Sequence, residues 1–340
     1  MKPTGRHHLA VLSLIAAIVA MPAAVTVGHA QQEPTETQEQ EIMSLVTIVG
    51  AALQGQIVST DEPFGWANDF LKSEEPNTFV PFTLSIDPSK ISTPTVAMYI
   101  FVAPQSAPAA DAAEPELPDP TFEDAYHIDL GAPTADGVYE VRRGFWAPGG
   151  DYDVYVALSD SDVPDGTEAK TMMLKKAGSV PNLWSGQLAT SSVIQAARID
   201  QLSAPPPPDQ QLANPYTLGT MRIVPKSSHE YLSSDELSLV FLVYNAGVAA
   251  SGLPDVNIEY TFNTRGPAGD EYFNRTTPQA FNEQTLPQGF DLALGHQLVA
   301  GLTIPLSGFP AADYRLEIVV TDNTNGASLT LDVDFSVSAS

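Results

Sequence analysis

The chain has 340 residues, which is room for two domains with cores of their own, because single domains usually run about 100–200 residues. Its formal charge of −26 becomes −28 once Lys2 and Arg6 are removed with the leader described next, since residues 1–30 contain no acid. Such a surface repels nucleic-acid phosphates and anionic lipid headgroups. The chain has no cysteine, which excludes disulfides, a lipidated cysteine anchor, thiolate metal sites and cysteine nucleophiles.

The first 30 residues have the pattern of a cleavable secretory signal peptide. Lys2 and Arg6 give a positive start, an apolar run covers 9–21, and Gly28-His29-Ala30 offers small residues before a cleavage site at Gln31. An uncleaved membrane anchor is the alternative, because the apolar stretch continues beyond residue 21. We expect cleavage, and a secreted or periplasmic protein without membrane insertion, since no later segment approaches about 18 consecutive apolar residues.

Residues 31–40 are polar and are predicted to form a disordered spacer. Between Glu41 and Leu53 the apolar residues fall at helical spacing, which favours a short helix, although the sequence of 46–49 suits a strand equally well. A first β-sandwich is expected within residues 41–203, interrupted by an acidic loop rich in Pro and Ala at 104–120. Its predicted strands are 78–86, 96–103, 125–130, 138–142, 151–158 and 171–175.

A run of four prolines within Ala204–Asp209 predicts a stiff linker at 204–215, followed by a second β-sandwich at 216–340. The expected strands of this second domain are 221–224, 237–244, 256–262, 271–275, 296–304, 314–321 and 328–337. Asn325-Gly326 separates the last two strands and predicts a hairpin with a type I′ turn, or a longer connection over 322–327.

One strand motif occurs twice. Asp151-Tyr152 and Asp313-Tyr314 each open a run in which alternate residues are apolar, the period of a strand with one face on a core. In immunoglobulin-like sandwiches a tyrosine at the entry of such a strand forms a tyrosine corner, its hydroxyl bonding back to the preceding loop. Tyr152 and Tyr314 are therefore predicted to be equivalent structural residues. The expected fold class is all-β, two tandem immunoglobulin-like sandwiches.

Three segments resemble a known group of proteins. Phe79-Val80-Pro81-Phe82-Thr83-Leu84, the segment 150–156 and the segment 309–317 are similar to parts of uncharacterised secreted bacterial proteins with tandem immunoglobulin-like or fibronectin III-like sandwiches. The resemblance runs from about residue 45 to the end. It implies tandem sandwiches and brings no catalytic or binding residues with it.

Three histidines remain after the leader: His127, His229 and His296. None has a second ligand at the short spacing typical of zinc sites, so structural or surface roles are favoured and no metal or other cofactor is expected from them. A serine hydrolase can assemble its triad from distant positions, but Gly-x-Ser-x-Gly is absent from the chain. A hydrolase stays the third hypothesis for function.

The most site-like turn covers Asp160, Asp162 and Asp165, closed by Gly166. Three carboxylates on one turn can supply oxygen ligands to calcium, but the run lacks the length and the glutamate of an EF-hand loop. The same residues are expected in an ordinary hydrophilic turn for backbone reasons, and that interpretation is favoured.

Trp66, Trp146 and Trp184 are candidates for a sugar-stacking platform, although large aromatic residues more often belong to sandwich cores. A carbohydrate-binding module is therefore the second hypothesis. The leading one is a non-enzymatic secreted or periplasmic interaction or structural protein with a protein or glycan partner. Sandwiches bind through end loops or at a sheet edge, and the sequence does not choose between these.

Overall fold

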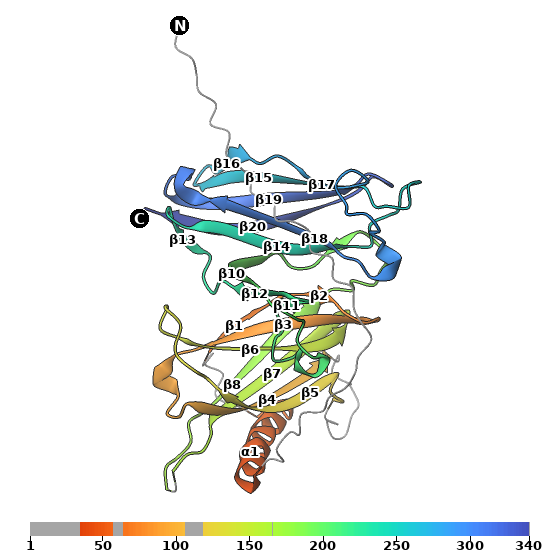
Figure 1. The fold of residues 1–340 in the computed structure, drawn as a ribbon. Helices are drawn as coiled ribbons and strands as arrows, with labels where there is room; N and C mark the ends of the chain where they lie inside the picture. The colour runs from red at the N-terminus through yellow and green to blue at the C-terminus, as the bar shows by residue number, and fades with distance from the viewer. Residues whose placement is uncertain (1–34, 57–63, 106–117, 165, 340) are drawn as a thin grey trace. The chain divides into compact units, whose positions relative to one another are not determined.

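The computed structural model describes residues 35–56, 64–105, 118–164 and 166–339 (Figure 1). The expected signal peptide and most of the Pro/Ala-rich loop lie outside these residues. The described chain is mostly strand and forms two compact units, each of which is considered by itself. We call them the first sandwich, which ends at Asn182 and includes 208–215, and the second sandwich, which comprises Leu183–Pro207 and the chain from Tyr216 onward. In the described residues no helix combines the length and apolar character that a membrane span requires.

The first sandwich has two antiparallel sheets. One has the order β1–β3–β2 with β6 also paired to β3, and the other has the order β5–β4–β7–β8. The bounds of these strands are β1 Gly65–Asn68, β2 Leu71–Lys72, β3 Asn77–Ile86, β4 Thr95–Pro104, β5 Phe122–Asp129, β6 Tyr139–Pro148, β7 Gly150–Asp160 and β8 Thr171–Val180. A short 3₁₀ helix, Pro88–Lys90, connects β3 to β4. Alternate residues of β3, β4 and β7, such as Phe82, Met98 and Val156, bury into one core between the sheets.

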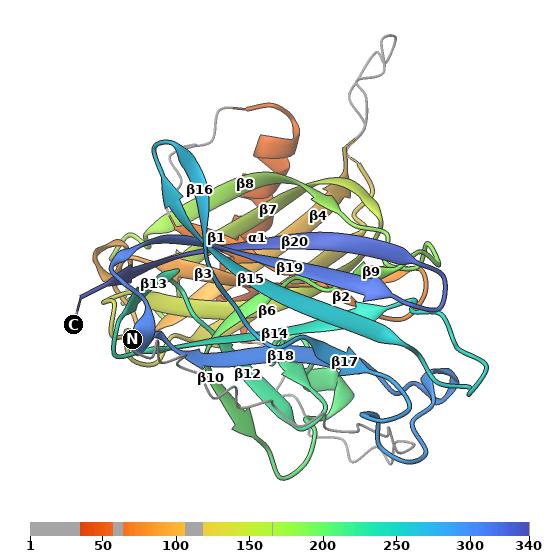
Figure 2. The ribbon, with the colours of Figure 1, turned by 90° about the horizontal axis from the view of Figure 1, so that it is seen from above.

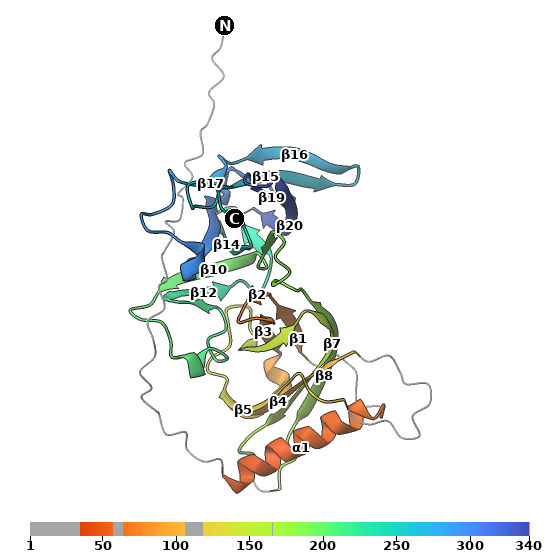
Figure 3. The same cartoon turned by 90° about the vertical axis from the view of Figure 1, so that its right-hand side faces the viewer.

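Helix α1, Glu36–Leu53, covers the outer face of the β5–β4–β7–β8 sheet (Figure 3). Leu45 and Val49 are fully buried there against alternate residues of β4, which is therefore apolar on both faces. The predicted spacer at 31–40 is wrong for its second half, because the helix begins at Glu36. Thr35 accepts a hydrogen bond from the backbone N–H of Gln38, whose side chain accepts one from the N–H of Thr35.

The second sandwich also has two sheets. Their orders are β11–β12–β10–β14–β18, with β9 beside β14, and β13–β20–β19–β15–β16, with β17 beside β15 (Figure 2). The bounds are β9 Ala189–Thr190, β10 Ile194–Gln201, β11 Thr217–Leu218, β12 Met221–Pro225, β13 Glu230–Leu232, β14 Glu236–Tyr244, β15 Val256–Gly266, β16 Gly269–Arg275, β17 Gln279–Phe281, β18 Leu298–Pro305, β19 Ala312–Asp322 and β20 Ala327–Ser338. Among the described residues, the second sandwich has the 3₁₀ helices Leu292–Leu294 and Leu306–Gly308, and another, Pro208–Gln210, lies in the segment 208–215 that groups with the first sandwich.

The boundary between the units differs from the one predicted at residue 204. β10 pairs with β12 and β14, and Ile194 and Ala196 are buried beside Val240 on the outer face of that sheet. Residues 183–203 therefore belong to the second sandwich, and the proline run follows its first long strand. The boundary falls before residue 204 because strand pairing decides which unit a segment joins. A run of prolines marks a break in regular structure but carries no information about which strands pair.

Tyr152 and Tyr314 occupy equivalent positions. Each lies near the start of a strand that pairs on one side with the next strand in the chain, β8 or β20, and on the other with an earlier strand, β4 or β15. The Tyr152 hydroxyl donates to the carbonyl of Pro148 at 3.0 Å, and that of Tyr314 donates to the carbonyl of Pro310 at 2.7 Å. Both rings are buried. Each hydroxyl therefore bonds back to the loop before its strand, as predicted, and the structure places the accepting carbonyl four residues upstream in both cases.

The connection between β19 and β20 is not a two-residue type I′ turn. Asp322 pairs with Ala327, so four residues form the loop, and Gly326 has φ 77° whereas Asn325 does not take a positive φ. The buried Asp322 carboxylate organises this loop by accepting hydrogen bonds from Gly247 and Thr324 backbone N–H groups and from two side chains of the loop. The conformation of this loop therefore depends on the hydrogen bonds of the Asp322 side chain and not on a two-residue turn.

Candidate functional site

Glu41 of α1 is the centre of a polar cluster on the first sandwich. One carboxylate oxygen, Oε2, accepts a hydrogen bond from the Ser161 hydroxyl at 2.7 Å and lies 2.9 Å from Nε2 of His127. The other, Oε1, accepts the backbone N–H of Asp162 at 3.0 Å. Ala97 pairs with His127 across β4 and β5, so this imidazole is on the face that α1 covers. The cluster therefore ties the helix to the sheet and to the end of β7.

The electrostatics of this cluster favour an ionised carboxylate. Burial by itself raises the pKa of Glu41, but the hydrogen bonds from Ser161, Asp162 and His127, together with the charge of His127, outweigh it and lower the pKa below its ordinary value. The side chains of Glu41 and His127 are only 15% and 19% exposed, and Ser161 is fully buried.

This arrangement differs from a catalytic triad. In a serine hydrolase the histidine stands between the serine and the acid, and takes the serine proton. Here the carboxylate stands in the middle, and the Ser161 hydroxyl donates to Glu41. Ser161 is buried and its hydroxyl donates to Glu41, so it helps to hold α1 on the sheet and is not exposed as a nucleophile.

The other two histidines have different surroundings. Nδ1 of His296 accepts the backbone N–H of Asp291 at 2.9 Å, and its ring lies 5.5 Å from that of Phe290. The backbone carbonyl of His229 accepts the N–H of Ser336. His127 belongs to the first sandwich, whereas His229 and His296 belong to the second, and within the described ranges no three His, Cys, Asp or Glu side chains gather in a way that could hold a metal ion.

The turn considered as a weak calcium candidate loses one of its possible ligands. Asp160 is buried, and its carboxylate accepts hydrogen bonds from the backbone N–H groups of Ser92 and Lys170, at 2.8 and 3.2 Å, and from the Thr93 hydroxyl at 3.3 Å. It faces the protein because these donors would otherwise be left without partners. Asp162 is exposed and Asp165 lies outside the described residues, so calcium binding stays the less favoured hypothesis for this turn, and Asp160 no longer supports it.

The three tryptophans do not form one platform. Trp66 stacks on Phe82 at 4.6 Å on the core side of the sheet, whereas Trp146 lies 5.6 Å from Phe79. Phe79 and Phe82 are three residues apart in β3 and point to opposite faces, so the two indoles do as well. Trp184 belongs to the second sandwich. All three are half-buried, and sequence spacing could not show that they lie on different faces.

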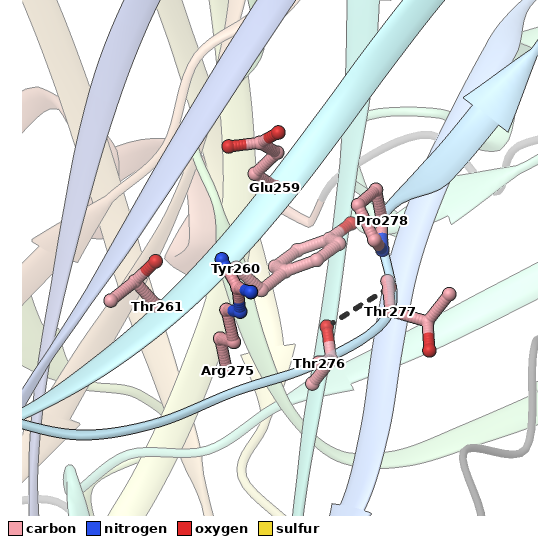
Figure 4. Close-up of a pocket in the computed structure, with 7 residues that line it drawn as sticks. All are labelled: Glu259, Tyr260, Thr261, Arg275, Thr276, Thr277 and Pro278. Carbon is pink, nitrogen blue, oxygen red and sulfur yellow. Dashed lines mark hydrogen bonds between the residues drawn. The ribbon is translucent and has the colours of Figure 1, made fainter.

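A pocket of about 420 Å³ opens on the second sandwich beside β15 (Figure 4). Its lining comes from β15 and from the segment that leaves β16 for β17, and consists of Glu259, Tyr260, Thr261, Arg275, Thr276, Thr277 and Pro278. We call it the β15 pocket. It exists because β16 pairs with β15 only from Thr261 onward, and β17 pairs with it only up to Ile258. No sequence motif predicts this pocket, since it arises where the pairing of β15 with β17 has ended and its pairing with β16 has not yet begun.

Comparison with known proteins identifies no family. No family model matches the chain, and no curated protein matches it. Among solved structures, trypsin-activated alpha-2-macroglobulin from Escherichia coli matches 83% of this chain at 14% identity, with a TM-score of 0.23. Alpha-2-macroglobulin from Salmonella that has reacted with methylamine matches 83% at 14% identity, with a TM-score of 0.20.

This chain spans only 17% of the length of those alpha-2-macroglobulin chains. Similarity at such low identity and TM-score carries no argument about what the protein does, because unrelated functions share sandwich folds.

Proposed function

We propose that this chain is a non-enzymatic secreted or periplasmic protein in which two tandem immunoglobulin-like sandwiches serve as an interaction or structural module. The observation that carries the proposal is the repetition of one sandwich plan. In the first sandwich β3 pairs with β6, and β4, β7 and β8 are successive neighbours in the other sheet. In the second, β14 and β18 and then β15, β19 and β20 repeat that arrangement.

These strands correspond to B and E in one sheet and to C, F and G in the other sheet of an immunoglobulin-like fold. Tyr152 and Tyr314 then stand at the start of strand F, where that fold has its tyrosine corner. The signal-peptide pattern supports an extracytoplasmic location for such a module.

One observation favours binding or support over catalysis, and a second bears on the kind of partner. The most reactive-looking cluster, at Glu41, has the carboxylate between the serine and the histidine, which suits helix docking. Trp66 and Trp146 lie on opposite sides of a sheet, so a flat sugar platform has no support from them. A protein partner is accordingly favoured over a glycan partner.

The experiment is capture by cross-linking from envelope and culture-medium fractions, with an unrelated β-sandwich of equal negative charge as the control bait. We expect the same partner to be captured repeatedly by this chain and not by the control. A panel of ester, peptide and glycoside substrates is run in parallel, with the Ser161→Ala variant beside the wild type. Repeated absence of any partner, together with turnover that Ser161→Ala abolishes, would overturn the proposal in favour of a hydrolase.

A further inference from the structure

The outer face of the β13–β20–β19–β15–β16 sheet carries a network of ion pairs. Arg315 lies 2.9 Å from an oxygen of Asp270 and 3.7 Å from one of Asp332, while Arg265 donates to Asp334 at 3.1 Å. Exposed ion pairs contribute little stability individually, so this network is chiefly a way of keeping opposite charges satisfied on a polar face.

Arg275 and Glu259 depart from that pattern. Thr261 pairs with Arg275 across β15 and β16, and Glu259 lies two residues before Thr261 in the same strand. All three side chains therefore project from the same face, and Glu259 and Arg275 are diagonal neighbours. In the part of the chain that the structure describes, neither charged group makes a side-chain hydrogen bond or an ion pair, and both line the β15 pocket.

The walls of the β15 pocket around Glu259 and Arg275 are held in place by hydrogen bonds. Tyr260 is buried in its wall, with its hydroxyl donating to Gln279 at 3.0 Å, so this wall is fixed by the sheet. The Thr276 hydroxyl donates to the carbonyl of Thr277 at 3.2 Å, which holds the opposite rim. Figure 4 shows the lining residues, with Glu259 and Thr261 on β15 and Thr276 and Thr277 on the segment that leads from β16 to β17. A volume of about 420 Å³ is within the range of small-molecule sites.

We propose that the β15 pocket binds a small zwitterionic ligand, of the class of a free amino acid or a short peptide. The carboxylate of the ligand pairs with the Arg275 guanidinium, and its ammonium group pairs with the Glu259 carboxylate. A ligand with only an anionic group is repelled by Glu259 and by the acidic surface of the protein. A ligand with only a cationic group is repelled by the Arg275 guanidinium. A ligand that carries both charges pairs with both side chains at once. This inference goes beyond the proposed function and does not depend on it.

The test is an NMR titration of the full chain with the dipeptide alanyl-alanine, followed at the backbone amides of Thr261, Thr276 and Thr277. N-acetylalanine, which has no ammonium group, and alaninamide, which has no carboxylate, are the single-charge probes, and glucose is the neutral one. We expect saturable shifts with the dipeptide in the millimolar range, because the site is open to water. Each single-charge probe should bind about tenfold more weakly, as the loss of a charged hydrogen bond predicts.

Arg275→Gln and Glu259→Gln should each weaken dipeptide binding by about tenfold, while Arg265→Gln, which removes a paired arginine from the same face, should leave it unchanged. Thermal melts confirm that the variants fold. The proposal fails if the dipeptide causes no shift up to about 50 mM, well above the millimolar range expected. It fails equally if single-charge probes or glucose bind as well as the dipeptide, or if the two pocket variants bind like wild type.

Discussion

Tyr314 is the position at which the sandwich fold is most directly tested. Its ring is fully buried, and its hydroxyl donates to the carbonyl of Pro310 at 2.7 Å. It also packs against the rings of Phe273, Phe309 and Phe335, with centroid separations of 5.4, 5.3 and 5.2 Å. Tyr314→Phe removes only the hydrogen bond, whereas Tyr314→Ala removes the ring as well. The pair of variants therefore separates the two contributions.

The magnitudes follow from these contacts. Loss of one hydroxyl hydrogen bond lowers the free energy of unfolding by about 1 kcal/mol, so Tyr314→Phe should be mildly destabilising. Truncating a buried aromatic ring costs roughly 3–5 kcal/mol, and three ring neighbours place Tyr314→Ala at the upper end of that range. Tyr152→Phe is the matched control. Its hydrogen bond to Pro148 is longer, at 3.0 Å, so its effect should be no larger and should fall on the first sandwich.

The assay is urea unfolding of the full chain with pulsed hydrogen exchange and mass spectrometry. A two-domain chain does not have to unfold in one step, so each sandwich needs its own signal. Peptides from β19 and β20 report the second sandwich, and peptides from β4 report the first. We expect the Tyr314 variants to shift the midpoint for β19 and β20 and to leave that for β4 in place.

Two results would refute this reasoning. The first is Tyr314→Ala costing no more than Tyr314→Phe, which would mean that the ring is not part of the core. The second is a Tyr314 variant that destabilises β4 as much as β19, which would mean that the two sandwiches do not unfold as separate units.

Two further variants test the polar contacts. Glu41→Gln should weaken docking of α1 by roughly 1–3 kcal/mol, measured by hydrogen exchange in the helix, while exposed Glu39→Gln should not. Because the pKa of Glu41 is lowered in the folded state, its contribution is complete above the ordinary value of 4.5 and is lost as the pH falls through the folded-state pKa. Equal effects of the two glutamates would contradict this. Asp322→Ala removes the buried carboxylate that caps the hairpin and should lower the free energy of unfolding in urea by roughly 2 kcal/mol or more. The control, Asp332→Ala at an exposed ion pair, should lower it by about 0–1 kcal/mol. A smaller loss of stability in Asp322→Ala than in Asp332→Ala would refute the capping role of Asp322.

Most strands could be predicted because alternation is a local property of the sequence. In β19 and β20 every second residue faces one core, and the register Tyr314 to Phe335 follows once the hairpin is placed. The tyrosine corners were predictable for the same reason, since donor and acceptor are four residues apart. The helix start was missed because Thr35 and Gln38 act through capping, which overrides the polar composition of 36–40.

The sequence by itself therefore determined the fold class, most of the long strands and the two tyrosine corners, all of which depend on residues close together in the chain, but it missed β10. Only the tertiary structure decided the rest. Glu41 meets His127 and Ser161 across 86 and 120 positions of sequence, and the β15 pocket exists because two different strands pair with separate halves of β15. Contacts of that range depend on sheet order and register, and a period-two pattern specifies which face a residue occupies but not which strand lies beside it.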